Sequence, residues 1–281
     1  MKNILHHTPA IALSLAASAA PLRGQARVSW SPHGDSLAIA TTIEGREGIH
    51  VIAADGSGSR LLYAIGGQQT YPAYPAWSPD GAWIAYASKV DGDGEIYRIP
   101  VGGGEPVRLT DNDAEDSYPA WSPDGGRLAF MSNRTGNLQL YLMRPDGSGQ
   151  RRLTHSDRND WNPSWSPDGA RLVYETNRHG GGQDEIYEIE VNTGSETRLT
   201  TTAENDIFPD WSSRGAIAYC TVAQRHAAVS VIGPGAGVPR RLVDDACLPR
   251  WSPDGGRLGF DRAGAVFVMD GEDGRPVQLL S

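Results

Sequence analysis

A tripeptide, Trp-Ser-Pro, returns along the whole length of this 281-residue chain and limits the folds open to it. It stands in WSPHG at Trp30, in WSPDG at Trp77, Trp121, Trp165 and Trp251, and in the altered form WSSRG at Trp211. The copies lie 40 to 47 residues apart, a period typical of β-propeller blades and not of all-helical solenoids. Six copies therefore predict six blades.

Each repeat has the same internal order of short apolar runs and turns. In the third repeat, RLAFMS at 127–132, LQLYLM at 138–143 and RRLT at 151–154 are separated by turns rich in Gly, Asn and Asp. Such runs predict antiparallel strands joined by hairpins, and no helical periodicity appears after the first twenty residues. The predicted fold is all-β, a six-bladed β-propeller of four-stranded antiparallel blades in which the motif tryptophans and prolines are scaffold.

The two ends of the chain suggest its processing and its closure. Lys2 precedes the run AIALSLAASAA at 10–20, which is too short to span a membrane, so we expect a signal peptide at 1–26 and a propeller at 27–281. A leader that is kept in the cytoplasm is the alternative. Each predicted blade is one continuous stretch, so closure of the ring is expected to depend on side-chain packing between the first and last blades. The mature protein is predicted to be periplasmic or secreted, monomeric and without a membrane span.

Charge and cysteine content bear on the partners and the compartment. The formal net charge is −9, and loss of Lys2 and Arg23 with the leader would make it −11. An acidic surface of this kind argues against nucleic acid as a partner. Cys220 and Cys247 fall on adjoining predicted blades, and both a disulfide and two separate buried thiols are compatible with the sequence.

The repeat resembles that of a known family. The recurring order of WSPDG, an aliphatic strand, a turn with Arg and Gly, a strand with Ile-Tyr, DG and RLT is similar to the TolB propeller, the C-terminal domain of the periplasmic Tol-Pal protein. The resemblance covers nearly all of 27–281 and implies a stand-alone propeller without the α/β domain that precedes it in TolB. Similar repeats occur in propellers of prolyl oligopeptidase relatives and in oligogalacturonate lyases. In TolB, the channel mouth binds a lipoprotein or a colicin-derived peptide, so the resemblance implies an envelope protein, such as a lipoprotein, as partner.

The loops that lead into each first strand, and those between strands two and three, are expected to surround the channel mouth. Large aromatic side chains there follow aspartates that stand three residues before a proline. The candidate partner-binding residues are Asp116, Tyr118, Asp160, Trp161, Asp206 and Phe208, with Tyr71 and Tyr74 in the loop before the second blade. Carboxylates interleaved with aromatics predict a rim that binds a protein or peptide. The competing interpretation is that the aspartates cap backbone amides and the rings fill blade junctions.

Arg134 and Arg178 follow the second strands of two repeats at equivalent positions. A guanidinium there could bridge to a carboxylate of a neighbouring blade, and Asp116 and Asp160 are the natural partners. Such ion pairs would neutralise part of the acidic rim.

The sequence favours a binding protein over an enzyme. It has no Gly-x-Ser-x-Gly pentapeptide, so we expect no serine nucleophile, no catalytic residue and no cofactor. A metal-dependent carbohydrate lyase is the alternative if His155, His179 and His226 converge on a metal ion, and a scaffold that binds along the blade sides is another if an apolar patch is exposed there. Weak calcium binding at the rim would involve Asp113, Asp116, Asp160 and Asp206.

Overall fold

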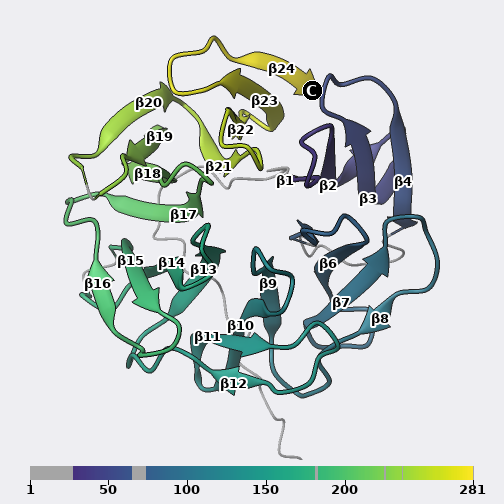
Figure 1. The fold of residues 1–281 in the computed structure, drawn as a ribbon, viewed down its shortest axis with the longest axis horizontal. Helices are drawn as coiled ribbons and strands as arrows, with labels where there is room; N and C mark the ends of the chain where they lie inside the picture. The colour runs from purple at the N-terminus through teal and green to yellow at the C-terminus, as the bar shows by residue number, and fades with distance from the viewer. Residues whose placement is uncertain (1–27, 65–73, 181–182, 225, 236, 281) are drawn as a thin grey trace, which may run out of the picture.

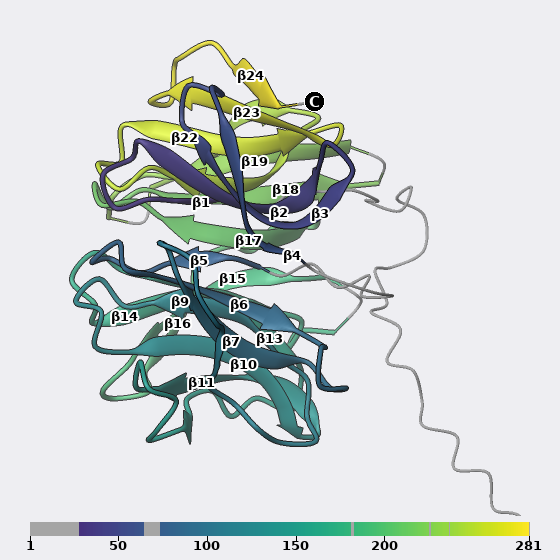
Figure 2. The ribbon, with the colours of Figure 1, turned by 90° about the vertical axis from the view of Figure 1, so that its right-hand side faces the viewer.

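Six β-sheets stand around a central axis, and the ring is shorter along that axis than across it (Figures 1 and 2). The computed structural model describes residues 28–64, 74–180, 183–224, 226–235 and 237–280. These residues form 24 strands and contain no helix, and hence none that could span a membrane. The predicted six-bladed propeller of four-stranded antiparallel blades is confirmed. The predicted leader at 1–26 lies outside the described residues. So do residue 27, where the propeller was expected to begin, and Tyr71.

Within every blade the strands follow one another from the axis outward in chain order. Blade one contains β1 Val28–Trp30, β2 Ser36–Ile43, β3 Arg46–Ala53 and β4 Ser59–Ala64. Blade two contains β5 Ala76–Trp77, β6 Trp83–Ser88, β7 Glu95–Pro100 and β8 Val107–Arg108. Blade three contains β9 Asp116–Trp121, β10 Leu128–Thr135, β11 Asn137–Met143 and β12 Arg151–Arg152.

The second half of the ring repeats this order. Blade four contains β13 Asp160–Trp165, β14 Arg171–Thr176, β15 Glu185–Glu190 and β16 Glu196–Arg198. Blade five contains β17 Asn205–Trp211, β18 Ile217–Ala223, β19 His226–Ile232 and β20 Arg240–Asp244. Blade six contains β21 Cys247–Trp251, β22 Arg257–Arg262, β23 Ala265–Asp270 and β24 Val277–Leu280.

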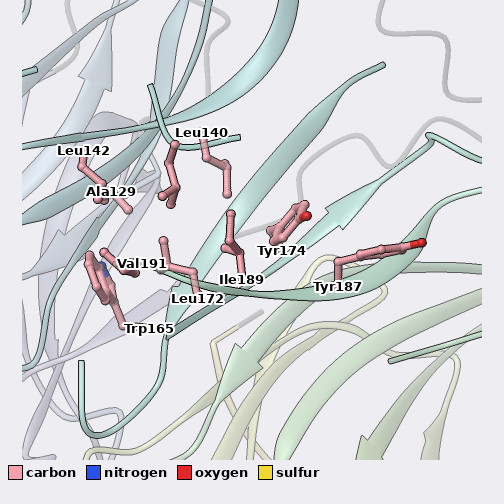
Figure 3. Packing of buried hydrophobic residues seen from close by; sticks show 10 residues of the cluster. Ala129, Leu140, Leu142, Trp165, Leu172, Tyr174, Tyr187, Ile189 and Val191 are labelled. Atoms are coloured by element: carbon pink, nitrogen blue, oxygen red, sulfur yellow. The ribbon is translucent and has the colours of Figure 1, made fainter. Parts of the chain in front are cut away.

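Apolar side chains of neighbouring blades form the core. In Figure 3, Ala129, Leu140 and Leu142 of blade three point toward Leu172, Tyr174 and Ile189 of blade four, and all six are buried. Alternation along each strand places one set of side chains on the preceding blade and the other on the following blade. Each fully buried large aliphatic side chain contributes roughly 1.5–3 kcal/mol, so the ring is held together by its blade junctions.

The turn after each first strand explains the repeated motif. In WSPDG the serine hydroxyl donates to the aspartate, as Ser252 does to Asp254 at 2.6 Å, and the glycine adopts a left-handed backbone. The motif proline packs on that glycine of the next blade, where a Cβ at Gly125 would lie 3.3 Å from Pro79. We call the side formed by these turns, at 31–35, 78–82, 122–126, 166–170, 212–215 and 252–256, the WSPDG face. The opposite side, formed by the loops 111–115, 155–159, 201–204 and 245 between blades and by the hairpins between second and third strands, is the inter-blade face.

The ring closes between blade six and blade one without exchange of a strand. The Trp30 indole N–H donates to the Arg250 carbonyl at 3.1 Å, and the Arg257 guanidinium lies 4.7 Å from the centre of the Trp30 ring and donates to the Gly34 carbonyl. Val28 of blade one and Val266 of blade six share a buried cluster, and Figure 1 shows the end of β24 beside blade one. Closure by side-chain packing is therefore confirmed.

Candidate functional site

The first strand of most blades contains a bulge just before its proline. Antiparallel pairing with the second strand shifts register there in blades three to six. The residue before the proline has φ between 42° and 56° in five blades, at Tyr74, Tyr118, Asn162, Phe208 and Leu248. A bulky residue in this region is held against its own preference by its surroundings, and a bulge redirects side chains. Tyr118 and Phe208 therefore occupy equivalent positions, whereas Trp161 stands one residue earlier in its blade.

Asp116 and Asp160 are the first residues of β9 and β13, Asp206 is the second residue of β17, and all three are buried, with 0% exposure. Each accepts a hydrogen bond from a side chain four residues before it, on the loop that leads into its strand. These bonds are Asn112 to Asp116 at 2.8 Å, Ser156 to Asp160 at 2.8 Å and Thr202 to Asp206 at 3.0 Å. All three aspartates therefore hold the inter-blade loops in place.

Arginines neutralise two of these carboxylates. Arg134 lies 2.7 Å from Asp116, and Arg178 lies 3.2 Å from Asp160. The predicted partners are confirmed, but each pair lies within one blade instead of between blades, because antiparallel pairing sets the end of the second strand beside the start of the first. Burial raises the pKa of Asp116, although hydrogen bonds from Ser132 and the charge of Arg134 oppose the shift.

Asp206 has no arginine at the equivalent position, where Ala223 stands. Its second oxygen accepts a hydrogen bond from Thr221 at 3.0 Å, and burial raises its pKa to about 6. Asp184, nearby on the same junction, also has a pKa of about 6 because of burial and the negative charge of Glu185. The junction between blades four and five therefore contains two carboxyl groups whose pKa is raised to about 6.

The rim aromatics are half-buried and held in place. The rings of Tyr74 and Tyr118 stack with centroids 3.8 Å apart, and the Tyr118 hydroxyl donates to that of Tyr74 at 2.8 Å. The Phe208 backbone N–H donates to the buried Glu175 carboxylate, and Glu175 is also the cross-strand neighbour of Trp161. Sequence reasoning missed Glu175. The feature that could have revealed it is a carboxylate at a second-strand position where blades two, three and five have Ala87, Met131 and Cys220.

A cavity of about 370 Å³ occupies the channel. Its wall includes residues of the first strands and reaches the turn residues Pro123, Pro167 and Pro253 of the WSPDG face. Of the six candidate residues, Tyr118 lines this cavity and the other five do not. The wall also carries two charged residues that sequence reasoning missed, Asp210 and Arg250. Both stand directly before a motif tryptophan, at a position that is Ser or Ala in the first four repeats, and this change of residue type could have revealed them.

The remaining candidate groups stand apart. Cys220 of β18 and Cys247 of β21 form a disulfide that links blades five and six. His155 bonds the Leu153 carbonyl at 3.1 Å, His179 bonds the Tyr187 hydroxyl, and His226 lies 3.6 Å from an Asp245 carboxylate oxygen. Within the described ranges, no group of three or more His, Cys, Asp or Glu side chains is arranged to hold a metal ion. The convergence that the lyase alternative requires is thus not seen there.

Comparison with known proteins agrees with the blade geometry. Residues 112–240 match the family described as the TolB beta propeller domain. A putative TolB from Agrobacterium tumefaciens superposes with a TM-score of 0.67 at 26% identity, over 78% of this chain and 80% of that one. The chain is a TolB-like β-propeller. TolB from Acinetobacter baumannii has a TM-score of 0.70 at 22% identity, with 94% of the TolB-like propeller covered but only 65% of the Acinetobacter chain.

The TolB-like propeller also shares its fold with an enzyme. An oligogalacturonate lyase in complex with manganese superposes with a TM-score of 0.62 at 15% identity, over 84% of this chain and 72% of that one. Sequence identity this low shows only that the two proteins share a fold, because propellers host many unrelated functions. The function of the TolB-like propeller must therefore be argued from its own rim and channel.

Proposed function

We propose that this TolB-like propeller is an exported, non-catalytic protein that binds a protein or peptide partner at the inter-blade rim of its channel. The observation that carries the proposal is the set of half-buried rings on a rigid support. Tyr118, Trp161 and Phe208 stand on or beside strained bulges, and buried carboxylates fix the strands and loops that carry them. Rigid aromatic side chains supply contact area with little loss of conformational entropy on binding.

The six candidate residues divide into two roles in this proposal. The three aromatics contact the partner, and Asp116, Asp160 and Asp206 hold the loops from below because their carboxylates are buried and hydrogen-bonded. Exposed carboxylates on the same face, such as Asp113 and Asp157, can attract a basic or amide-bearing partner. The partner is therefore expected to be a protein or peptide segment with cationic side chains, and in the cell envelope a lipoprotein is one candidate.

Export and solubility are part of the same proposal. The predicted leader at 1–26 and the disulfide between blades five and six both suit an oxidising compartment such as the periplasm. Exposed large hydrophobic residues in the described chain are Val90, Val107, Val238 and Val277. They are single side chains on loops and outer strands, which favours a monomer that binds at the rim over a scaffold that binds along its sides.

The test uses single substitutions that leave the buried supports intact. We expect Trp161→Ala and Phe208→Ala each to weaken partner retention from an envelope extract by about 30-fold, the scale of an interface hot spot, while the thermal midpoint stays close to that of the wild type. Val238→Ala is the matched control, because it shortens an exposed apolar side chain far from the rim. A photo-crosslinking amino acid at position 161 should label the same partner. Equal retention by folded Trp161→Ala and wild type would reject rim binding.

A further inference from the structure

A groove on the outer side of the ring separates blade five from blade six. It has a volume of about 460 Å³ and lies along β20 of blade five, with Met269 of β23 and Pro276 before β24 in its other wall. Figure 1 shows these three strands beside one another at the edge of the ring. Three arginines and three acidic residues line it, Arg240, Arg241, Arg262, Asp244, Glu272 and Asp273. Because these charges balance, the groove repels an anion less than the average surface of a chain with net charge −9.

Arg262 belongs to an arrangement that blades three and four also contain. In each of these blades a guanidinium lies 4.5 to 5.9 Å from the centres of two aromatic rings, one on the second strand and one on the third. The three sets are Arg134 with Phe130 and Tyr141, Arg178 with Tyr174 and Tyr187, and Arg262 with Phe260 and Phe267. The two rings of each set are cross-strand neighbours. Stacking therefore holds the three guanidinium groups at equivalent places.

The three guanidinium groups differ in what they bind. In blades three and four each has a carboxylate on the first strand and a second acceptor at the start of the outer strand. These partners are Asp116 and Gln150 for Arg134, and Asp160 and Glu196 for Arg178. Among the described residues, Arg262 has no carboxylate partner; its Nη2 donates to the Asp244 carbonyl at 3.0 Å, and its buried Nε has no acceptor. A guanidinium carries five N–H donors, so one bond to a carbonyl leaves most of its capacity unused.

The sequence of blade six explains why both acceptors are missing. At the first-strand position of the two aspartates it has Ala246. At the outer-strand position of Glu196 it has Pro276, because β24 pairs with β23 at this point in the same register as β16 with β15. Neither residue has a side chain that accepts a hydrogen bond, and Pro276 lines the groove together with Met269 and Arg262. The groove thus opens where blade four has a glutamate between the outer strand and the guanidinium.

The other two arginines of the groove are already neutralised. Arg240 pairs with Glu272, and its Nη1 lies 3.6 Å from an Asp273 carboxylate oxygen. The Nε of Arg241 lies 2.7 Å from an Asp244 carboxylate oxygen. Every carboxylate among the described residues of the groove therefore faces one of these two arginines, and the guanidinium that stacks on the rings is left for another acceptor.

From these features we infer that the groove between blades five and six binds a carboxylate of a ligand, which Arg262 takes in place of the missing glutamate. A guanidinium presents a planar fork that matches the two oxygens of a carboxylate, and Arg178 with Glu196 forms this pair in blade four. The groove is larger than one carboxylate and within the size of small-ligand sites, which span about 300–1,000 Å³, so the body of the ligand lies along β20. The carboxylate could belong to an acidic side chain of a peptide or to a small free acid. None of the rim aromatics lines this groove, and the inference does not depend on the proposed function.

The first experiment compares acids with amides of nearly the same shape. One pair is acetyl-Ala-Glu-Ala-amide and acetyl-Ala-Gln-Ala-amide, and the other is glutarate and glutaramide. Each is titrated into the protein, and binding is followed by calorimetry and by the NMR signals of the Arg262 side chain. In at least one pair we expect the acid to bind ten-fold more tightly than its amide; the tighter of the two acids shows whether the ligand is a peptide segment or a small acid. Equal affinity of acid and amide in both pairs, or no binding of either acid up to about 10 mM, above the roughly millimolar range of weak sites, overturns the inference.

Removal of the guanidinium tests its assignment. Arg262→Gln should weaken binding of the acid at least ten-fold and leave binding of the amide unchanged. Arg144→Gln is the matched control, because Arg144 is an exposed arginine of blade three outside the groove, and it should change neither. Undiminished acid binding by folded Arg262→Gln overturns the inference.

A second variant keeps the guanidinium and supplies an internal carboxylate. Pro276→Glu places a glutamate where blade four has Glu196, on an exposed position that should tolerate the change. We expect it to raise the thermal midpoint and to weaken binding of the acid at least ten-fold, because the new side chain occupies Arg262. Pro276→Ala is its control and should show neither effect. If Arg262→Gln does not fold, Pro276→Glu decides, and undiminished acid binding by this variant overturns the inference.

Discussion

The first strands of blades three and four are held by ion pairs and by indole hydrogen bonds, whereas those of blades five and six are held by hydroxyl and carboxylate groups and by a disulfide. At the start of the first strand, Asp116 and Asp160 are paired with arginines, and Asp206 accepts hydrogen bonds from threonine hydroxyls. Blade six has Ala246 there, followed by the disulfide-bonded Cys247. The same point of the blade is thus stabilised in three chemically different ways. Repeats of one fold need to conserve the shape of the junction but not the interaction that holds it.

The end of the first strand shows a second difference. The indoles of Trp121 and Trp165 donate to the carbonyls of Ala76 and Ala120 on the preceding blade, at 3.1 and 3.0 Å. For the next two tryptophans, the backbone N–H of Trp211 donates instead to the Ser164 hydroxyl and that of Trp251 to the Asp210 carboxylate. The indole N–H groups of these two are buried without a hydrogen-bond partner in the described part of the chain. A side-chain acceptor on the preceding blade therefore replaces the indole bond.

The largest effect is expected where the ion pair is removed. Arg178 is 18% exposed and pairs with both Asp160 and Glu196, so Arg178→Met should destabilise the protein by about 3–5 kcal/mol because buried carboxylate charge loses its partner. Urea unfolding would measure this, with Arg144→Met as the exposed control. Combining Arg178→Met with Asp160→Asn should recover part of the loss. A change below about 1 kcal/mol would mean that the pair behaves as a solvated one.

Loss of the disulfide should have the next largest effect. Cys220 and Cys247 are 27 residues apart in sequence, and a cross-link of that span contributes about 2–4 kcal/mol. The double variant Cys220→Ala, Cys247→Ala should therefore unfold at lower urea concentration. A reductant should shift the wild type by the same amount and leave the variant unchanged; a shift of the variant would point to another cause.

Asp206→Asn should stabilise the protein at neutral pH. The folded pKa of Asp206 is about 6, above the unfolded value near 3.9, so the folded state binds the proton more tightly. Stability from this group is present below about pH 4 and is lost as the pH rises through 6. The amide cannot ionise, so Asp206→Asn should stabilise the protein by on the order of 1–2 kcal/mol at pH 7.5 and not at pH 4. Thermal midpoints across this range would check it, and destabilisation at pH 7.5 would show that the ionised form is preferred.

The smallest effect is expected at the tryptophans. Ser164→Ala removes the hydrogen bond that the Trp211 backbone N–H donates at 3.0 Å and the longer one that the Ser164 hydroxyl donates to Asp210 at 3.3 Å. It should cost about 1 kcal/mol, less if the Trp211 indole then bonds the residue 164 carbonyl. Hydrogen exchange of the indole N–H by NMR would show this as new protection of Trp211, to the level of Trp165. No gain in protection would mean that the two modes of bonding are not alternatives.

Most of the architecture could be predicted from residues that act locally. The alternation of strands such as RLAFMS, the DG turns and the period of the motif specify hairpins and their number without reference to distant contacts. The site was harder to predict. Asp116 and Asp160 were recognised together with their arginines, but their burial, the equivalence of Tyr118 with Asn162 instead of Trp161, and the bulge that causes it depend on strand register.

The sequence by itself determined the number of blades, the course of each strand and the scaffold role of the motif, because turns and side-chain alternation are encoded within a few residues. Only the tertiary structure decided which charges face solvent, which of the two cysteine states is formed, and that Asp210 and Arg250 meet in the channel. These contacts join residues 27 to 40 positions apart in sequence. Their geometry follows from how neighbouring blades pack around one axis, and no local pattern specifies that packing.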